Sequence, residues 1–236
     1  MGAGGRDQRK LISVWRRLLL ALSVCSILVA ISILYVDRPV ATVIARFHLY
    51  ENFFGNQLLY LPILTWLAVA AIVMSLAFVI ILRRFLRPLI AAIEAGFAMV
   101  WAFWITDVIL KPWFGRILPY EFLHGQQFGF YWFHQGFQFG SFPSGHAAQI
   151  SALASVLWIR FPRWRSAYAL TAISLMLLLV LGEWHFVSDV IAGSFIGAAI
   201  GVLTTRASDF ALAKIWPMFH RDDVVVESDN ETGPGA

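Results

Sequence analysis

Long apolar runs separated by short polar segments are the dominant pattern of the chain. A helix needs about 20 predominantly apolar residues to cross the hydrocarbon core of a bilayer. Six runs approach or exceed this length, although the last three are shorter or contain polar residues. They are residues 18–36, 58–82, 88–110, 144–159, 166–182 and 186–204. The pattern therefore predicts an all-α protein that forms a bundle of six transmembrane helices.

The runs divide the chain into three parts. We expect a basic N-terminal segment (1–17), a six-span membrane domain (18–206) and a tail (207–236) whose acidic, Gly- and Pro-containing end is typical of disorder. The first run follows basic residues, as the core of a signal peptide does. It is longer than a typical signal core, however, and no clear small-residue cleavage site follows it, which favours a retained first span.

The distribution of charge orients the predicted bundle. Of the 18 Lys and Arg residues, all but four lie at one end, in the N-terminal segment, in alternate loops and after the sixth span. The four exceptions are Arg38, Arg46, Lys111 and Arg116. Because cytoplasmic loops are enriched in Lys and Arg, this asymmetry places both termini in the cytoplasm. Since the basic residues follow the loops, the net charge of +4 does not indicate nucleic-acid binding.

Composition agrees with a membrane protein. The chain is 59% hydrophobic and only 14% charged, whereas soluble domains carry roughly 25% charged residues. The single cysteine, Cys25, lies inside an apolar run and cannot form an intrachain disulfide.

Polar residues from three distant segments gather at the outer end of the predicted bundle. Lys111 closes the third span, a Pro-Ser-Gly-His segment (143–146) opens the fourth, and His185 and Asp189 open the sixth. Ionisable residues at membrane depth are costly and mark functional sites. The topology therefore predicts a single site on the outer face.

These residue types suit phosphoryl transfer. His185 and Asp189 are four residues apart and share a helix face, so the carboxylate can accept a hydrogen bond from one ring nitrogen and leave the other as a nucleophile or base. His146 can protonate a leaving oxygen. At the start of the fourth span, Ser144 suits a helix cap, and Gly145 leaves room for an anion at the helix N-terminus.

Each feature also has a structural explanation. Pro-Ser-Gly-His suits a turn and cap, the His/Asp pair suits a helix surface, and Lys111 suits an interfacial lysine that pairs with Asp107 four residues earlier. A zinc site formed by the two histidines and Asp189 is a further alternative, but Lys111 and Gly145 would serve no metal. The occurrence of all of them at one face favours a catalytic site.

The pattern resembles the type 2 phosphatidic acid phosphatase superfamily, whose members are histidine phosphatases with three motifs. The motifs are Lys, six residues and Arg-Pro; Pro-Ser-Gly-His; and Ser-Arg, five residues, His, three residues and Asp. "FPSGHAA" and "HFVSDVIAG" carry the resemblance, which covers roughly residues 58–205. It implies that His185 attacks phosphorus to form a phosphohistidine, that Asp189 orients His185, and that His146 protonates the leaving group. The phosphate-binding residues that it implies are Lys111, Ser144 and Gly145, and it implies that no metal or cofactor is required.

Two motif positions depart from the family. Leu118 and Leu179 stand where the first and third motifs have arginine. A charge-assisted hydrogen bond contributes about 1.5–3 kcal/mol, so two uncompensated losses would lower the rate by orders of magnitude. We expect Arg116, in an "FGR" that some members carry, and His134, in "WFHQG", to bind substrate instead. An interfacial loop histidine is the alternative for His134.

The segment between Lys111 and Ser144 is rich in aromatic residues, which suit the headgroup level of a membrane. It is either a lid that admits a lipid headgroup or an aromatic belt without a substrate role.

We therefore expect a multi-pass membrane phosphatase, in a bacterial cytoplasmic membrane with its site on the outer face, that hydrolyses a lipid phosphate or pyrophosphate. Phosphatidic acid, phosphatidylglycerol phosphate, a polyprenyl pyrophosphate and lipid A are candidate substrates. One alternative is a phosphotransferase that uses the same phosphohistidine. Another is a non-catalytic lipid-binding or transport protein, which the missing arginines favour.

Overall fold

The computed structural model describes residues 3–48, 63–82 and 86–219, and helices account for all the regular elements within these ranges. The all-α prediction is confirmed. The long elements are α1 (Ala3–Ile31), α2 (Asp37–Ala45), α3 (Ile63–Leu82), α4 (Arg87–Phe103), α7 (Gly145–Arg160), α8 (Arg165–Leu181) and α9 (Val187–Phe219). The short ones are the π-helical η1 (Ser32–Val36) and η4 (Trp104–Leu110), α5 (Lys111–Phe114), α6 (Pro119–Leu123) and the 3-10 turns η5 (Phe137–Phe139) and η6 (Pro162–Trp164).

Five stretches within the described ranges are long and apolar enough to cross a membrane. They are Ile12–Ala45, Ile63–Ile81, Arg87–Phe114, Pro162–Leu181 and Val187–Lys214. The predicted fourth span corresponds to α7, which has 16 residues and is therefore about 24 Å long at 1.5 Å per residue. This is shorter than the roughly 30 Å of a bilayer core, so the count of six spans stays a prediction.

Several helices extend beyond the predicted boundaries. The first begins at Ala3 and continues through η1 into α2, and the third continues through η4 into α5. The last runs to Phe219, past the predicted end of the membrane domain at residue 206. Residues 58–62, the predicted start of the second span, and 220–236 of the tail lie outside the described residues.

Helices α4, α7 and α9 form the centre of the bundle, where small side chains allow close packing. The contact between α7 and α9 depends on glycine. A Cβ atom at Gly193 would lie 2.2 Å from the carbonyl oxygen of Ser144, and one at Gly197 would lie 1.9 Å from that of Ala148. The Gly193, Gly197 and Gly201 stripe therefore serves helix packing within the bundle, as in other membrane helix pairs.

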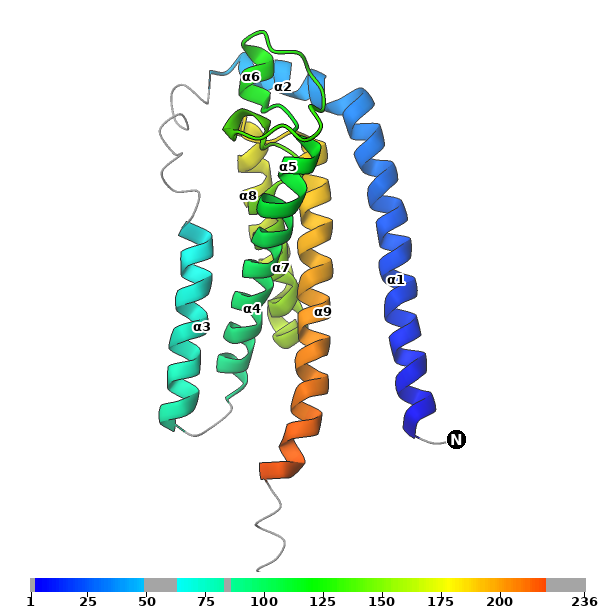
Figure 1. Cartoon of the computed structure of the whole chain (residues 1–236), viewed down its shortest axis with the longest axis vertical. Helices are drawn as coiled ribbons and strands as arrows, with labels where there is room; N and C mark the ends of the chain where they lie inside the picture. Colours follow the sequence, from blue (N-terminus) through cyan, green and yellow to red (C-terminus); the bar gives the residue numbers. More distant parts are fainter. Residues whose placement is uncertain (1–2, 49–62, 83–85, 220–236) are drawn as a thin grey trace, which may run out of the picture.

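The two ends of the bundle differ in content. The start of α1 and the end of α9 lie at one end, and α2, α5 and α6 lie at the other (Figure 1). Near the first end, Arg160 of α7 binds Glu94 of α4 at 2.6 Å and Asp209 of α9 at 2.8 Å. Because α7 begins at the opposite end, Glu94 is a packing partner far from the predicted site.

Candidate active site

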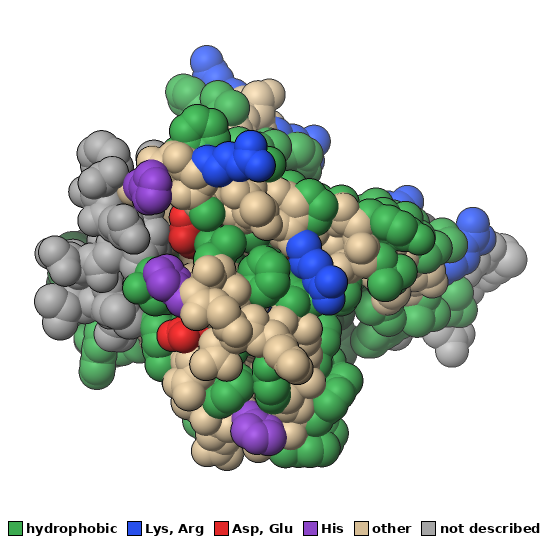
Figure 2. Space-filling view, turned by 90° about the horizontal axis from the view of Figure 1, so that it is seen from above, with side chains coloured by type: hydrophobic (Ala, Val, Ile, Leu, Met, Phe, Trp, Pro, Cys, Tyr) green, Lys and Arg blue, Asp and Glu red, His purple; other side chains and the backbone are tan. Residues whose placement is uncertain are grey.

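A cavity of about 650 Å³ brings together four of the predicted site residues. Lys111, His134, His146 and His185 all line it. It lies at the end of the bundle that carries α5 and the start of α7, where histidine and charged side chains appear among hydrophobic ones (Figure 2). The predicted convergence of two histidines and a lysine on one space is therefore present in the fold.

The ring of His185 is oriented by a backbone carbonyl. Its Nδ1 lies 2.9 Å from the carbonyl oxygen of Ser141 and 3.8 Å from Oδ2 of Asp189. Since a carbonyl only accepts hydrogen bonds, Nδ1 carries the proton in this arrangement, and Nε2 keeps a lone pair. The expected hydrogen bond from the ring to Asp189 is thus replaced by one to Ser141, with Asp189 in ion-pair range behind it.

Asp189 is fully buried and holds the segments around His185 together. Its carboxylate accepts hydrogen bonds from the Ser141 hydroxyl at 2.5 Å and from the backbone N–H of Phe186 at 2.7 Å. The second bond reaches back to the residue that precedes α9, as in a capping box. Asp189 does not line the cavity, so its carboxylate lies behind His185 and does not face that space.

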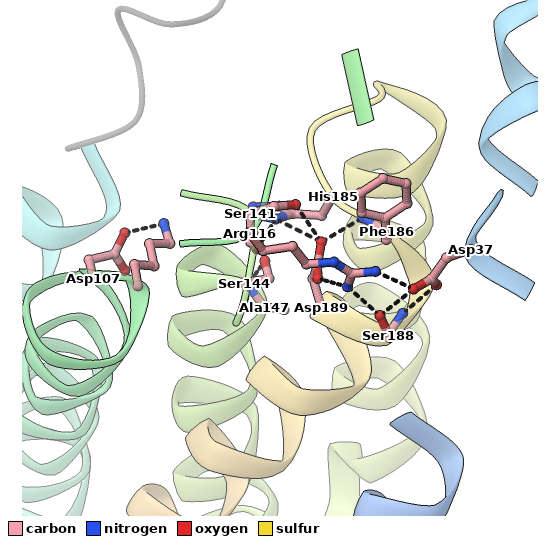
Figure 3. A network of polar contacts seen from close by, with 11 residues as sticks. Asp37, Asp107, Arg116, Ser141, Ser144, Ala147, His185, Phe186, Ser188 and Asp189 are labelled. Atoms are coloured by element: carbon pink, nitrogen blue, oxygen red, sulfur yellow. Dashed lines mark hydrogen bonds and ion pairs between the residues drawn. The ribbon is translucent and has the colours of Figure 1, made fainter. Parts of the chain in front are cut away.

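Arg116 lies in a buried network behind His185 rather than in the cavity (Figure 3). Its guanidinium forms an ion pair with Asp189 through Nη1 and with Asp37 through Nη2, the latter at 2.7 Å. The ring centroids of Phe186 and Phe130 lie 4.5 and 5.0 Å from the guanidinium carbon of Arg116. This position gives no support to the predicted contact between Arg116 and phosphate and instead makes Arg116 a link between two buried carboxylates.

Asp37 is a functional candidate that the sequence did not reveal. It is 1% exposed, at the start of α2. Its carboxylate accepts hydrogen bonds from the backbone N–H and the hydroxyl of Ser188, at 3.0 and 2.5 Å. The sequence did contain one signal for Asp37, a charged residue directly after the apolar run 18–36. If such a residue is buried, it must have a partner that balances its charge. The partner itself, Arg116, could not be identified from sequence.

The start of α7 has the geometry that its sequence predicts. The Ser144 side chain accepts a hydrogen bond from the N–H of Ala147 at 3.3 Å, which confirms the cap. A Cβ atom at Gly145 would lie 1.9 Å from Oδ2 of Asp107, so glycine is required there by a close neighbour. Neither Ser144 nor Gly145 lines the cavity, and their predicted contact with phosphate stays a prediction.

Lys111 pairs with Asp107, the alternative that its spacing left open. Nζ of Lys111 binds Oδ1 of Asp107, and the Thr106 hydroxyl donates to Oδ2 at 2.8 Å. Lys111 and Asp107 both line the cavity. Lys111 is therefore available to an entering anion only in competition with a carboxylate.

The aromatic loop folds back over the site. The Tyr131 N–H donates to the carbonyl of Gly115 at 2.9 Å. Gly115 adopts φ +54° with its missing Cβ 1.9 Å from the Tyr131 oxygen, so only glycine fits this close approach. His134 follows, exposed but lining the same cavity as His146. This places His134 where a substrate contact is feasible.

The zinc alternative is not supported. The described residues contain no group of three or more His, Cys, Asp or Glu side chains that could hold a metal ion. The carboxylate of Asp189 is bound to Arg116, Ser141 and Phe186 instead.

Comparisons with known proteins agree with the motifs. Lipid A 1-phosphatases of Rhizobium johnstonii and Rhizobium etli are each 38% identical to this chain over 96 residues. The aligned part covers 41% of this chain but only 39% and 41% of the two relatives, respectively. No solved structure matches the chain. The family model described as the PAP2 superfamily matches residues 91–212, and the chain belongs to this superfamily. The matched part includes every residue that lines the cavity and includes Arg116 and Asp189 of the buried network, but not Asp37.

Proposed function

We propose that this protein is a membrane phosphatase that hydrolyses a lipid phosphate or pyrophosphate through a phosphohistidine on His185. One observation carries the proposal: His185 and His146 line the same cavity, and Nδ1 of His185 is held by the Ser141 carbonyl at 2.9 Å. This hydrogen bond leaves Nε2 as the nucleophilic nitrogen.

The proposed reaction has two displacements at phosphorus. In the first, Nε2 of His185 forms a bond to phosphorus while the bond to the leaving oxygen breaks, and His146 donates a proton to that oxygen. In the second, His146 takes a proton from water, whose oxygen attacks phosphorus and releases phosphate and free His185. Lys111 offsets charge on the phosphoryl oxygens. These steps need neither metal nor cofactor.

The surroundings of the cavity support a lipid substrate. Its walls include Phe103, Val108 and Leu118, and five helices of the described chain are apolar enough to span a bilayer. The relatives named lipid A 1-phosphatase make a phosphorylated lipid of that type the first candidate. Phosphatidic acid, phosphatidylglycerol phosphate and polyprenyl pyrophosphates follow. The basic loops support a site on the outer face of the membrane, and the bacterial relatives support a bacterial cytoplasmic membrane as its location.

The test is phosphate release from these lipids by the detergent-purified protein. We expect His185→Ala to abolish turnover and His146→Ala to lower it by about two to four orders of magnitude, the usual range for a lost general acid. His124→Ala is the matched control, because His124 directly follows α6 and is outside the cavity lining. Equal turnover in wild type and His185→Ala would overturn the proposal.

The same assay separates the alternatives. A phosphotransferase would release little phosphate until a lipid or sugar acceptor is added, and would still require His185. A non-catalytic lipid-binding protein, which Leu118 in the cavity wall favours, would bind the lipids with and without His185 and release no phosphate.

A further inference from the structure

The position that an entering phosphate would take is already flanked by a negative charge. Asp107 lies on η4 and faces the start of α7, with Oδ2 1.9 Å from where a Cβ of Gly145 would stand. Its other oxygen binds Nζ of Lys111. A helix N-terminus and a lysine are the groups that attract phosphate, so the carboxylate competes for both.

The charge of the cavity follows from this pair. Among the residues that the structure describes, Lys111 and Asp107 are the only Lys, Arg, Asp or Glu that line it, and three histidines are its other titratable groups. With His146 protonated, as the proposed first step requires, and the other two histidines neutral, this lining carries a single net positive charge. Leu118 adds an apolar side chain to the wall. Such a cavity offers little to balance a dianion.

We propose that Asp107 is a specificity-determining residue that disfavours dianionic phosphoryl groups relative to monoanionic ones. The proposal rests on the proposed function for the position of the phosphoryl group. Substrates whose reacting phosphorus carries one negative charge, such as phosphodiesters, suffer less repulsion from the carboxylate than phosphomonoester dianions do. Repulsion between like charges a few ångströms apart is large in a partly desolvated site.

The alternative role for Asp107 is to hold Lys111 in place. The two roles predict opposite effects of Asp107→Asn, which keeps the size of the side chain and an oxygen that can accept from Thr106. If Asp107 only positions Lys111, its loss weakens binding of every anion. If it sets specificity, its loss strengthens binding, and does so more for the dianion.

The experiment compares methyl phosphate with dimethyl phosphate at pH 8. The first is mostly a dianion there, because the second pKa of a phosphomonoester is about 6, whereas the second keeps one charge at any pH. Binding to the detergent-purified protein is measured by calorimetry. We expect Asp107→Asn to bind methyl phosphate about tenfold more tightly than wild type, with a markedly smaller gain for dimethyl phosphate.

Two further variants complete the test. Glu121→Gln removes a charge from α6 outside the cavity lining and should leave both affinities unchanged. Asp107→Ala should reproduce the effect of Asp107→Asn. Equal gains for the two ligands, weaker binding, or no binding in both Asp107 variants would overturn the proposal. Because binding needs no turnover, a protein without phosphatase activity that still shows this selectivity would refute the proposed function alone.

Discussion

The buried Asp37 offers the sharpest test of how the fold supports the site. Asp37→Ala removes three hydrogen-bond acceptor contacts, two from Ser188 and one from Arg116. It also leaves the fully buried Arg116 with Asp189 as its single carboxylate partner. Breaking a buried ion pair by removing one partner costs about 3–5 kcal/mol. We expect a loss of unfolding free energy of this size.

A second substitution at the same position separates charge from hydrogen bonding. Asp37→Asn keeps an oxygen for the Ser188 N–H and leaves Arg116 and Asp189 as a pair of balanced charge. Wild type has two carboxylates around one guanidinium. Since neutralising one of them removes repulsion as well as attraction, Asp37→Asn should cost clearly less than Asp37→Ala. Equal costs would show that the charge of Asp37, rather than its hydrogen bonds, provides the stability.

The assay is unfolding in detergent together with steady-state kinetics. The network contacts His185 through Asp189 and Ser141 and does not face the cavity. We therefore expect Asp37→Ala to lower kcat and to leave KM unchanged. Asp209→Ala is the control, since Asp209 is 47% exposed in its pair with Arg160 and surface pairs contribute about 0–1 kcal/mol. The reasoning fails if Asp37→Ala unfolds like Asp209→Ala, or if its KM rises while kcat is unchanged.

Three further substitutions test separate parts of the fold. Gly145→Ala should lower both stability and kcat/KM because its Cβ would collide with Asp107. Adding Asp107→Ala should recover part of the stability, and additive losses in that double-mutant cycle would contradict the collision. Gly197→Ala should cost about 1–3 kcal/mol through overpacking of α9 on α7, measured against Gly129→Ala, where a Cβ meets nothing within 4 Å. Arg116→Lys should lower kcat, because an ammonium cannot bridge Asp37 and Asp189 as a planar guanidinium does, and unchanged kcat would exclude the bridge.

The sequence predicted what depends on local pattern. The apolar runs predicted the helices, and Ser144 predicted the cap of α7. The packed face of α9 was predicted by the glycine stripe of Gly193, Gly197 and Gly201. Each of these signals lies within a few residues of the structure it specifies. The predicted topology then indicated that Lys111, His146 and His185 share one site, because it places the end of the third span and the starts of the fourth and sixth at the same face.

Contacts without a local signal were missed. Asp37 and Arg116 are 79 residues apart, and no feature of either segment indicates that the two residues pair. The partner of His185 is the backbone carbonyl of Ser141, and a backbone acceptor is the same for every residue type. The prediction chose Asp189 because four-residue spacing favours it, and the structure places both acceptors near the ring with the carbonyl closer.

The two positions where the family motifs have arginine differ in consequence. Leu179 contributes its backbone carbonyl, which accepts from the N–H groups of Trp184 and His185 at 3.2 and 3.3 Å, so the turn before α9 does not depend on its side chain. Leu118 instead presents its side chain to the cavity. The contacts that support the proposed nucleophile therefore lie behind His185, whereas the charged side chains of the cavity, Lys111 and Asp107, lie on its other side. Variants of the first group should act on kcat and variants of the second on selectivity, because the two sets of contacts share no residue except His185 itself.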